Sequence, residues 1–320
     1  MHLDLRDRYR GSILGLAAGD ALGAPLEFSA PGHFTPVSDM IGGGPHGLDA
    51  GYWTDDTSMA LCLAVSLVER GFDLRDQAER YLRWYREGYM SSTGTCFDVG
   101  NTIREALERF EAEGDPLVGP THPRSAGNGS LMRLAPIPLV FARRPRLAVR
   151  RAAKSSLVTH GAPEAVDACR YFAALVVGVL SGEEKETVLA PEYAPIPGLW
   201  EEEPLAPAVA EVAAGSFTER QPPEIRGSGY VVHSLEAALW AFRHTDTFRT
   251  GCLAAVNLGE DSDTVGAIYG QLAGAYYGAR GIPEEWLDSL YWSSFLVSIA
   301  DELYRCAEED CAPAAEGGEG

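Results

Sequence analysis

Residues 257–278 of the chain read NLGEDSDTVGAIYGQLAGAYYG, and this stretch predicts how the protein folds. Asp, Ser and Thr side chains stand at the start of an apolar run, where such residues cap the free N–H groups of a helix. The same start places three carboxylates, Glu260, Asp261 and Asp263, within four residues. One carboxylate is enough for capping, and the helix dipole offsets only part of the repulsion. A bound cation would offset much more.

The apolar run carries a glycine at every fourth position: Gly266, Gly270, Gly274 and Gly278. Positions four apart share one face of a helix, and each interior glycine costs roughly 1 kcal/mol relative to alanine. The N-terminal segment has the same spacing, with Gly11, Gly15, Gly19 and Gly23. We predict that these two helices pack along their glycine stripes. Chance spacing in a chain with 35 glycines is the alternative.

Composition limits the class of protein. The chain has 320 residues, 46% of them hydrophobic, and a formal net charge of −20, which argues against nucleic acid or an anionic membrane as partner. Its six cysteines form no C-x-x-C pair and are expected to be free thiols. The charged N-terminal segment is not a signal peptide, and no apolar run is long enough to span a membrane. These features predict a cytoplasmic protein.

A second acidic helix start lies far away in the sequence. Residues 53–58 read WTDDTS and lead into an apolar run, so Thr54, Asp55 and Asp56 repeat the pattern at 261–264. Each start offers threonine and two aspartates, and hard oxygen ligands of this kind suit Mg²⁺ or Mn²⁺. Four carboxylates at one place predict two metal ions.

Other motifs have two readings each. Glu27 is a surface carboxylate or part of a site, and Asp98 either caps the helix that begins near 103 or faces a cleft. Residues 127–130 read GNGS and, ahead of an apolar segment, predict a cradle of N–H groups for a phosphate at a helix N-terminus. His160 opens a further helix, where a lone histidine is more often structural. The glycine-rich loop 29–52 is long enough to be functional or disordered.

No strand pattern appears along the chain. We expect an all-α fold, one domain of about ten to twelve helices over residues 1–306, followed by a disordered acidic tail at 307–320. Residues 181–228, called the insert below, are acidic and proline-rich, and one short helix is expected near 205–214.

The motifs together resemble the ADP-ribosylglycohydrolase family over about residues 8–300. They are Gly19-Asp20-Ala21-Leu22-Gly23 with Glu27, Trp53-Thr54-Asp55-Asp56-Thr57, Gly127-Asn128-Gly129-Ser130-Leu131-Met132-Arg133, Thr159-His160 and Gly259-Glu260-Asp261-Ser262-Asp263-Thr264. The segments 96–102 and 229–233 look like the branch typified by the dinitrogenase reductase-activating glycohydrolase. Glu260 departs from the family pattern, which often has Gly or Asp there, and the insert matches no motif of the family.

The resemblance implies an orthogonal helical bundle with a binuclear Mg²⁺ or Mn²⁺ centre that removes ADP-ribose from an arginine of a modified protein. The implied metal ligands are Thr54, Asp55, Asp56, Asp261, Asp263 and Thr264. The implied substrate-binding residues are Gly127, Asn128, Gly129, Ser130, Met132, His160 and Tyr230. Asp98 is the candidate catalytic carboxylate, or the contact to the guanidinium, because cleavage passes through an oxocarbenium-like state. Glu27 is the second candidate, to position water or a metal.

Three alternatives stay open at this point. The enzyme could act on another linkage, such as serine- or guanine-linked ADP-ribose. It could be a metal-dependent phosphoesterase on the same scaffold. It could also be a non-enzymatic relative used for binding or structure, which the loss of metal ligands would favour, and none of the implied ligands is missing.

Overall fold

The computed structural model describes residues 4–309, and this part of the chain consists of α-helices, three short 3₁₀ helices and the loops between them. The helices in chain order are α1 (Leu5–Gly23), η1 (Ala24–Leu26), α2 (Asp55–Arg70), α3 (Leu74–Glu87), α4 (Asn101–Glu113), η2 (Pro123–Ser125), α5 (Pro136–Phe141), α6 (Pro145–Ser156), α7 (Pro163–Leu180), α8 (Lys185–Val188), α9 (Leu199–Glu202), α10 (Pro207–Ala213), α11 (Ser216–Glu219), α12 (Val231–His244), α13 (Phe248–Val256), α14 (Ser262–Tyr277), η3 (Ala279–Gly281), α15 (Glu284–Ser289) and α16 (Ser293–Glu309).

The all-α prediction is confirmed: over residues 4–309 the structure has two isolated β-bridges and no strand. The predicted number of helices was too low, because the insert forms four helices where one was expected. Three of these, α8, α9 and α11, have four residues each, which is too short for a 3.6-residue period to appear in the sequence. Helix α16 includes residues 307–309 of the expected tail, and the rest of that tail lies outside the described residues.

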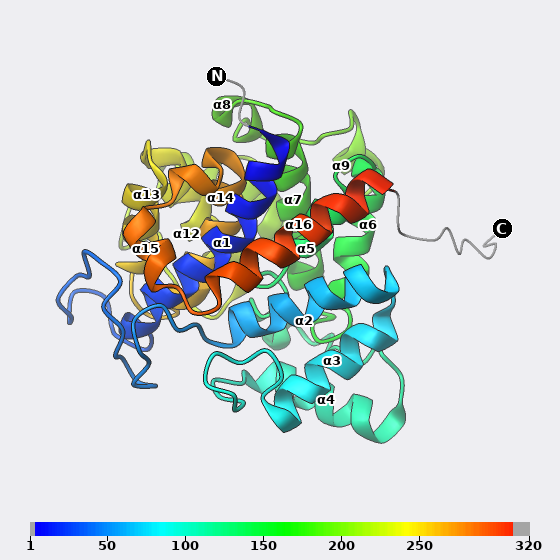
Figure 1. Cartoon of the computed structure of the whole chain (residues 1–320). Helices are drawn as coiled ribbons and strands as arrows, with labels where there is room; N and C mark the ends of the chain where they lie inside the picture. The colour runs from blue at the N-terminus through cyan, green and yellow to red at the C-terminus, as the bar shows by residue number, and fades with distance from the viewer. Residues whose placement is uncertain (1–3, 310–320) are drawn as a thin grey trace.

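Helices α1 and α14 lie side by side, α16 packs against α1, and α2 to α4 lie below them in Figure 1. Their glycines face each other in an antiparallel register. A Cβ atom on Gly15 would lie 2.3 Å from the carbonyl oxygen of Gly270, and one on Gly19 would lie 2.0 Å from that of Gly266. The predicted glycine packing is therefore correct, and we call this contact the glycine seam.

The close approach in the glycine seam also brings polar atoms together. The Ser12 hydroxyl donates to the Gln271 carbonyl oxygen at 2.9 Å, and the Ser262 hydroxyl donates to the Gly23 carbonyl oxygen at 2.8 Å. These bonds satisfy backbone carbonyls that already belong to a helix, so they add directional contacts to the packing.

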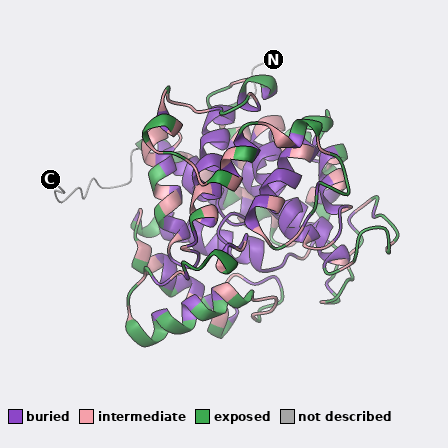
Figure 2. Ribbon diagram, turned by 180° about the vertical axis from the view of Figure 1, so that it is seen from behind, coloured by how far each residue is buried: buried purple, intermediate pink, exposed green. Residues whose placement is uncertain are grey.

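One continuous hydrophobic cluster runs through the described helices from α1 to α16, and a small second cluster lies beneath α9. Figure 2 shows buried residues gathered on the inner helices and exposed ones along the outer helix faces and loops. Within the described part, Cys62, Cys96, Cys169 and Cys252 are free thiols. None of the described helices combines the length and the apolar character needed to cross a membrane.

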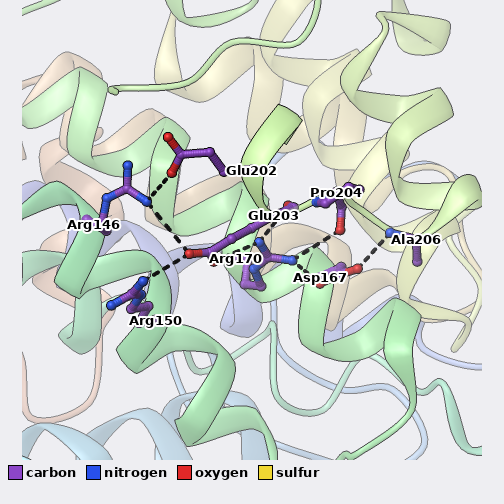
Figure 3. Close-up of polar contacts among 8 residues, drawn as sticks. All are labelled: Arg146, Arg150, Asp167, Arg170, Glu202, Glu203, Pro204 and Ala206. Atoms are coloured by element: carbon purple, nitrogen blue, oxygen red, sulfur yellow. Dashed lines mark hydrogen bonds and ion pairs between the residues drawn. The ribbon is translucent and has the colours of Figure 1, made fainter. Parts of the chain in front are cut away.

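The insert is fixed to α6 and α7 by a network of charged side chains (Figure 3). Arg170 of α7 lies at its centre, 2.6 Å from the Asp167 carboxylate and 2.8 Å from the Glu203 carbonyl oxygen. Glu203 also pairs with Arg150 of α6 at 3.2 Å, and Arg146 reaches Glu202 at 2.7 Å. Because Arg170 is largely buried, its bonds to the backbone hold the insert more firmly than surface pairs would.

Candidate active site

The glycine seam brings two aspartates of distant sequence together at one end. Asp20 lies on α1 next to Gly19, and Asp263 lies in the first turn of α14. A Cβ atom on Gly23 would lie 2.5 Å from the Cα atom of Asp263. The bare backbone at these glycines is therefore what allows the carboxylates to approach.

Asp20 connects α1 to the start of α2. Its buried carboxylate accepts four hydrogen bonds: Oδ1 from the backbone N–H and hydroxyl of Thr54 at 2.9 and 3.0 Å, Oδ2 from those of Thr57 at 3.0 and 2.6 Å. Burial raises the pKa of Asp20 to about 6, although these hydrogen bonds act to lower it. The N-terminus of α2 is thus capped by a carboxylate from another helix, and Thr54 makes no side-chain cap of its own.

Three carboxylates, of Asp20, Asp56 and Asp263, have oxygens within 4.8 Å of one another, and all three are buried. We call them the acidic cluster. The Thr54 hydroxyl lies 3.1 Å from Asp56 Oδ2 and 3.2 Å from Asp263 Oδ2, besides its contact with Asp20. Since one hydroxyl carries one proton, it can donate to only one of the three carboxylates at a time. The Thr264 hydroxyl is 3.4 Å from Asp56 Oδ2.

Two oxygens of the acidic cluster have no hydrogen-bond partner among the described residues: Asp56 Oδ1 and Asp263 Oδ1. Buried polar atoms are almost always satisfied, so each such atom needs an explanation. Burial, followed by the charges of neighbouring carboxylates, raises the pKa of Asp56 and of Asp263 well above its ordinary value. A divalent cation would supply the missing partner and the missing charge. The residues present therefore fit a metal site.

The acidic cluster borders a cleft of about 710 Å³. All residues predicted for the site line this cleft except Thr54, Asp56 and Ser130. Thr54 and Asp56 contact Asp263, which does line it, whereas the Ser130 hydroxyl accepts a hydrogen bond from Ser156 at 2.8 Å in the interior. Among the described lining residues, Arg124 is the only lysine or arginine.

Glu27 and Asp98 meet at the mouth of the cleft through His46. The imidazole Nε2 lies 2.8 Å from Glu27 Oε2 and 3.5 Å from Asp98 Oδ1. Burial first, and then the Asp98 and Asp261 charges, raise the pKa of Glu27 to about 9. Burial also raises the pKa of Asp98. Burial therefore favours the protonated form of both candidate catalytic carboxyl groups.

The capping alternative for Asp98 does not hold. Helix α4 begins at Asn101, and its N-cap is Gly100, which has no side-chain cap bond. Thr102 lies inside the first turn. Asp98 has a φ of 56°, in the left-handed region, and it points its carboxylate toward His46. The side chain of Asp261, the N-cap residue of α14, does not cap its helix either. Its Oδ2 accepts a hydrogen bond from the Asn128 side chain at 2.8 Å.

The segment 127–130 lies beside the acidic cluster, but the prediction that it opens a helix was wrong. A tight turn follows it, in which the N–H groups of Leu131 and Met132 both donate to the Asn128 carbonyl oxygen, at 2.8 and 3.1 Å. Helix α5 begins only at Pro136, and proline fits the first helical position. Gln271 of α14 fixes this turn, with its side-chain NH₂ 2.6 Å from the Met132 carbonyl oxygen.

We call residues 127–132 the glycine turn. His160 lies beneath it and is almost fully buried. A Cβ atom on Gly127 would meet its Nε2 at 3.3 Å, and one on Gly129 would meet its Cε1 at 2.8 Å. Its Nδ1 is 2.9 Å from the Thr159 hydroxyl, which accepts a hydrogen bond from Arg133 at 2.7 Å. Burial, with a smaller effect of Arg133, lowers the pKa of His160 to about 3, so the ring is neutral.

Tyr230 completes this side of the cleft. Residues Gly127 and Tyr230 form an isolated antiparallel bridge, and the Val231 N–H donates to the Ala126 carbonyl oxygen at 3.1 Å. Asn128 crosses the same junction, because its NH₂ donates to the Ser234 hydroxyl at 2.9 Å as well as to Asp261. The start of α12 is therefore attached directly to the glycine turn.

Three residues of the site were missed by the sequence analysis. Asp20 stood in a quoted motif without a role, and its partners lie 34 and 37 residues away. His46 stood in the glycine-rich loop, whose length was the only signal. Gln271 is a buried polar residue inside an apolar helix, and such a residue could have been noted as needing a partner.

Comparisons with known proteins show the family of the chain. The sequence model of the family described as ADP-ribosylglycohydrolase matches residues 1–313. Two relatives are named ADP-ribosylarginine hydrolase Tri1. The one from Serratia proteamaculans is 41% identical over 95% of this chain and 81% of its own length. The one from Pseudomonas putida is 45% identical over 95% of this chain and 79% of its own length.

A third relative, ADP-ribosyl-[dinitrogen reductase] glycohydrolase of Rhodospirillum rubrum, is 32% identical over 89% of this chain and 91% of its own length. Among solved structures, a chain described as an ADP-ribosylglycohydrolase-related protein complex superposes with a TM-score of 0.83 and 47% identity, covering 95% of this chain and 99% of that chain.

Proposed function

The chain belongs to the ADP-ribosylglycohydrolase family, and we propose that it hydrolyses the N-glycosidic bond between ADP-ribose and an arginine of a modified protein. The observation that carries the proposal is that one cleft borders the acidic cluster and is lined by both Asp98 and the glycine turn. Relatives with 41% and 45% identity are named for arginine-linked ADP-ribose, which supports this linkage over serine or guanine.

We propose that two Mg²⁺ or Mn²⁺ ions bind at the two acidic helix starts. Their ligands would come from the predicted set, namely Thr54, Asp55, Asp56, Asp261, Asp263 and Thr264. Asp20 would hold Thr54 in place by accepting a hydrogen bond from its hydroxyl. When bound, the ions supply positive charge that polarises oxygen atoms at the ribose end of the substrate. The two carboxylate oxygens without a partner support the presence of a cation here.

Asp98 and Glu27 act at the bond that breaks. Hydrolysis cleaves the bond between ribose C1 and a guanidinium nitrogen, adds the hydroxyl of water to C1 and returns a proton to the nitrogen. The positive charge of the guanidinium favours the ionised form of Asp98, which then holds the guanidinium by a charge-assisted hydrogen bond and stabilises positive charge on the sugar ring. Glu27, 2.8 Å from His46, positions the water.

His160 serves as a neutral hydrogen-bond donor to ADP-ribose. Arg133 can only donate, so the Thr159 oxygen accepts from it. The Thr159 hydroxyl then donates its own proton to His160 Nδ1. Because Nδ1 accepts this bond, the single proton of the neutral ring is on Nε2. That N–H lies beneath the glycine turn, where it would reach a phosphate or ribose oxygen, and Arg124 is the cationic group for the diphosphate.

The test is to offer the protein with Mg²⁺ or Mn²⁺ three substrates, with ADP-ribose linked to arginine, serine or guanine, and to measure free ADP-ribose. We expect release from arginine. Release from serine or guanine alone would assign another linkage, and release of phosphate or AMP with an intact glycosidic bond would indicate a phosphoesterase. A cytoplasmic location and the lack of a nucleic-acid partner stay predictions.

A further inference from the structure

Phe28 stands out at the mouth of the cleft, since 71% of its surface is exposed although it is a large apolar residue. It follows Glu27 directly, and its φ of 60° lies in the left-handed region that L side chains rarely adopt. Trp292 also combines exposure with a positive φ, but its ring stacks on Tyr291 at 4.9 Å and so has packing partners. Packing therefore does not account for the conformation of Phe28.

Backbone hydrogen bonds hold Phe28 in this conformation. Its N–H donates to the Glu260 carbonyl oxygen at 2.7 Å, and the Glu260 N–H donates to the Ser29 carbonyl oxygen at 2.8 Å. Glu260 itself has a φ of 58°. These backbone bonds join two residues of positive φ just ahead of Asp261, and they fix the Phe28 backbone relative to the start of α14. Strain of this kind is concentrated at ligand-binding sites.

Two other aromatic rings extend the same rim. The His46 ring centre lies 6.2 Å from that of Phe28 and 5.2 Å from that of Phe97, which is half-buried. His46 also contacts the carboxylates of Glu27 and Asp98. We define the aromatic rim as Phe28, His46 and Phe97. It is adjacent to the two candidate catalytic carboxylates, and Phe28 is its member that lines the cleft.

We propose that the aromatic rim is the subsite for the arginine side chain, and that Phe28 determines specificity for that side chain. The inference rests on the proposed function and names the part of the substrate outside ADP-ribose. A guanidinium is planar and cationic, so it stacks on an aromatic face while its N–H groups pair with a carboxylate. Phe28 offers the exposed face, and Asp98 offers the carboxylate. A serine linkage presents neither a plane nor a charge to this rim.

The experiment compares Phe28→Ala, Phe28→Leu and Phe28→Tyr with the wild type, measuring kcat/KM on ADP-ribosylarginine and the dissociation constant of free ADP-ribose. We expect kcat/KM to fall about tenfold in the Ala and Leu variants, mostly through KM, and to stay near wild type in the Tyr variant. The affinity for ADP-ribose should not change. Ile41→Ala is the matched control, because Ile41 is 63% exposed in the same loop region and does not line the cleft.

Each contrary result has a distinct meaning. Wild-type turnover in Phe28→Ala, or in Phe28→Leu, overturns the role of the aromatic face. Loss of ADP-ribose affinity by the same factor as kcat/KM also overturns it, because Phe28 would then contact the nucleotide. A wild-type enzyme that does not cleave ADP-ribosylarginine defeats the proposed function and this inference together, whereas an active wild type with an unaffected Ala variant defeats only the inference.

Discussion

The glycine seam and the acidic cluster lie on the same two helices, yet they differ in what they need. The seam packs the backbone of α1 against that of α14. The hydroxyls of Ser12 and Ser262 donate to backbone carbonyls across the seam, so both have a hydrogen-bond acceptor within the two helices. The acidic cluster buries three carboxylates at the end of that seam, and two of their oxygens have no partner in the described chain. The first region supplies rigidity, and the second uses that rigidity to hold like charges together.

The difference teaches how the site is built. Like charges repel, so carboxylates come together only where other interactions hold the backbone in place. Here the seam brings Asp20 and Asp263 together, and Asp20 in turn holds the N-terminus of α2 through Thr54 and Thr57. The packing of the seam and the hydrogen bonds of Asp20 therefore both hold the cluster together.

Asp263→Asn gives the largest expected effect, on the cluster side of the comparison. It removes a charge and a metal ligand while keeping the shape, so hydrolysis should fall by roughly 10³ or more and the number of bound metal ions should drop. Glu105→Gln, at an exposed position on α4, controls for the change in net charge. Full turnover with unchanged metal content in Asp263→Asn would show that the ligand assignment is wrong.

Gly270→Leu is the corresponding change in the seam. Even a Cβ atom at this position would lie 1.9 Å from the Gly15 carbonyl oxygen, so the helices must separate and the free energy of unfolding should fall by about 3 kcal/mol or more. Gly100→Ala is the control, because its Cβ would meet nothing nearer than Ile103 at 3.9 Å. Denaturant unfolding compares the two, and equal stability would place the seam's role in doubt.

Asp98→Asn tests a residue of the cleft that belongs neither to the glycine seam nor to the acidic cluster. We expect both metal ions to bind and ADP-ribose affinity to remain, because neither the acidic cluster nor the glycine turn uses this carboxylate. Turnover of ADP-ribosylarginine should fall by about 10², the scale of a lost electrostatic or acid–base group. If the Asn variant keeps near-normal turnover, Asp98 has a structural role and the catalytic assignment moves to Glu27.

His160→Gln gives the smallest expected effect, a change in how the free energy of unfolding depends on pH. The His160 pKa is lowered, so its contribution has the opposite sign to those of Asp20 and Glu27, whose pKa values are raised. Its folded pKa of about 3 lies below the ordinary value of 6.5, so its contribution is complete above pH 6.5 and declines as the pH falls, since the unfolded chain binds the proton first. Between pH 7.5 and 5 the wild type should lose about 1–2 kcal/mol more of unfolding free energy than His160→Gln. Parallel pH curves would contradict this. His33→Gln, an exposed histidine, is the control.

What the sequence could predict depended on how local the signal was. The glycine seam was predicted with its partners, because a four-residue spacing on two segments is local and periodic. The motifs also predicted that Thr54 and Asp56 would lie near Asp263 and Thr264, and the structure brings these four residues together. Whether Asp98 caps a helix could not be decided, because capping depends on where α4 begins, and the structure begins it at Asn101.

Other features depended on contacts between distant segments. The four bonds of Asp20, the contact of His46 with Glu27 and the anchoring of the glycine turn by Gln271 each join residues 19 or more positions apart. The helix expected after Ser130 is replaced by a turn, and the next helix begins only at Pro136. The short helices of the insert make contacts with distant residues, such as Glu203 with Arg170 and Lys185 with Thr245, which no local pattern reveals.

Thermal unfolding with and without divalent cations tests the central claim most directly, that the acidic cluster is incomplete by itself whereas the seam is not. Chelated wild type should melt higher on addition of Mn²⁺ or Mg²⁺, by mass action on the folded state. Chelated Asp263→Asn should melt at or above chelated wild type, because one buried repulsion is gone, and should gain much less from the metal. A wild type whose melting temperature does not respond to either cation, or an Asn variant that is less stable than chelated wild type, would contradict the account.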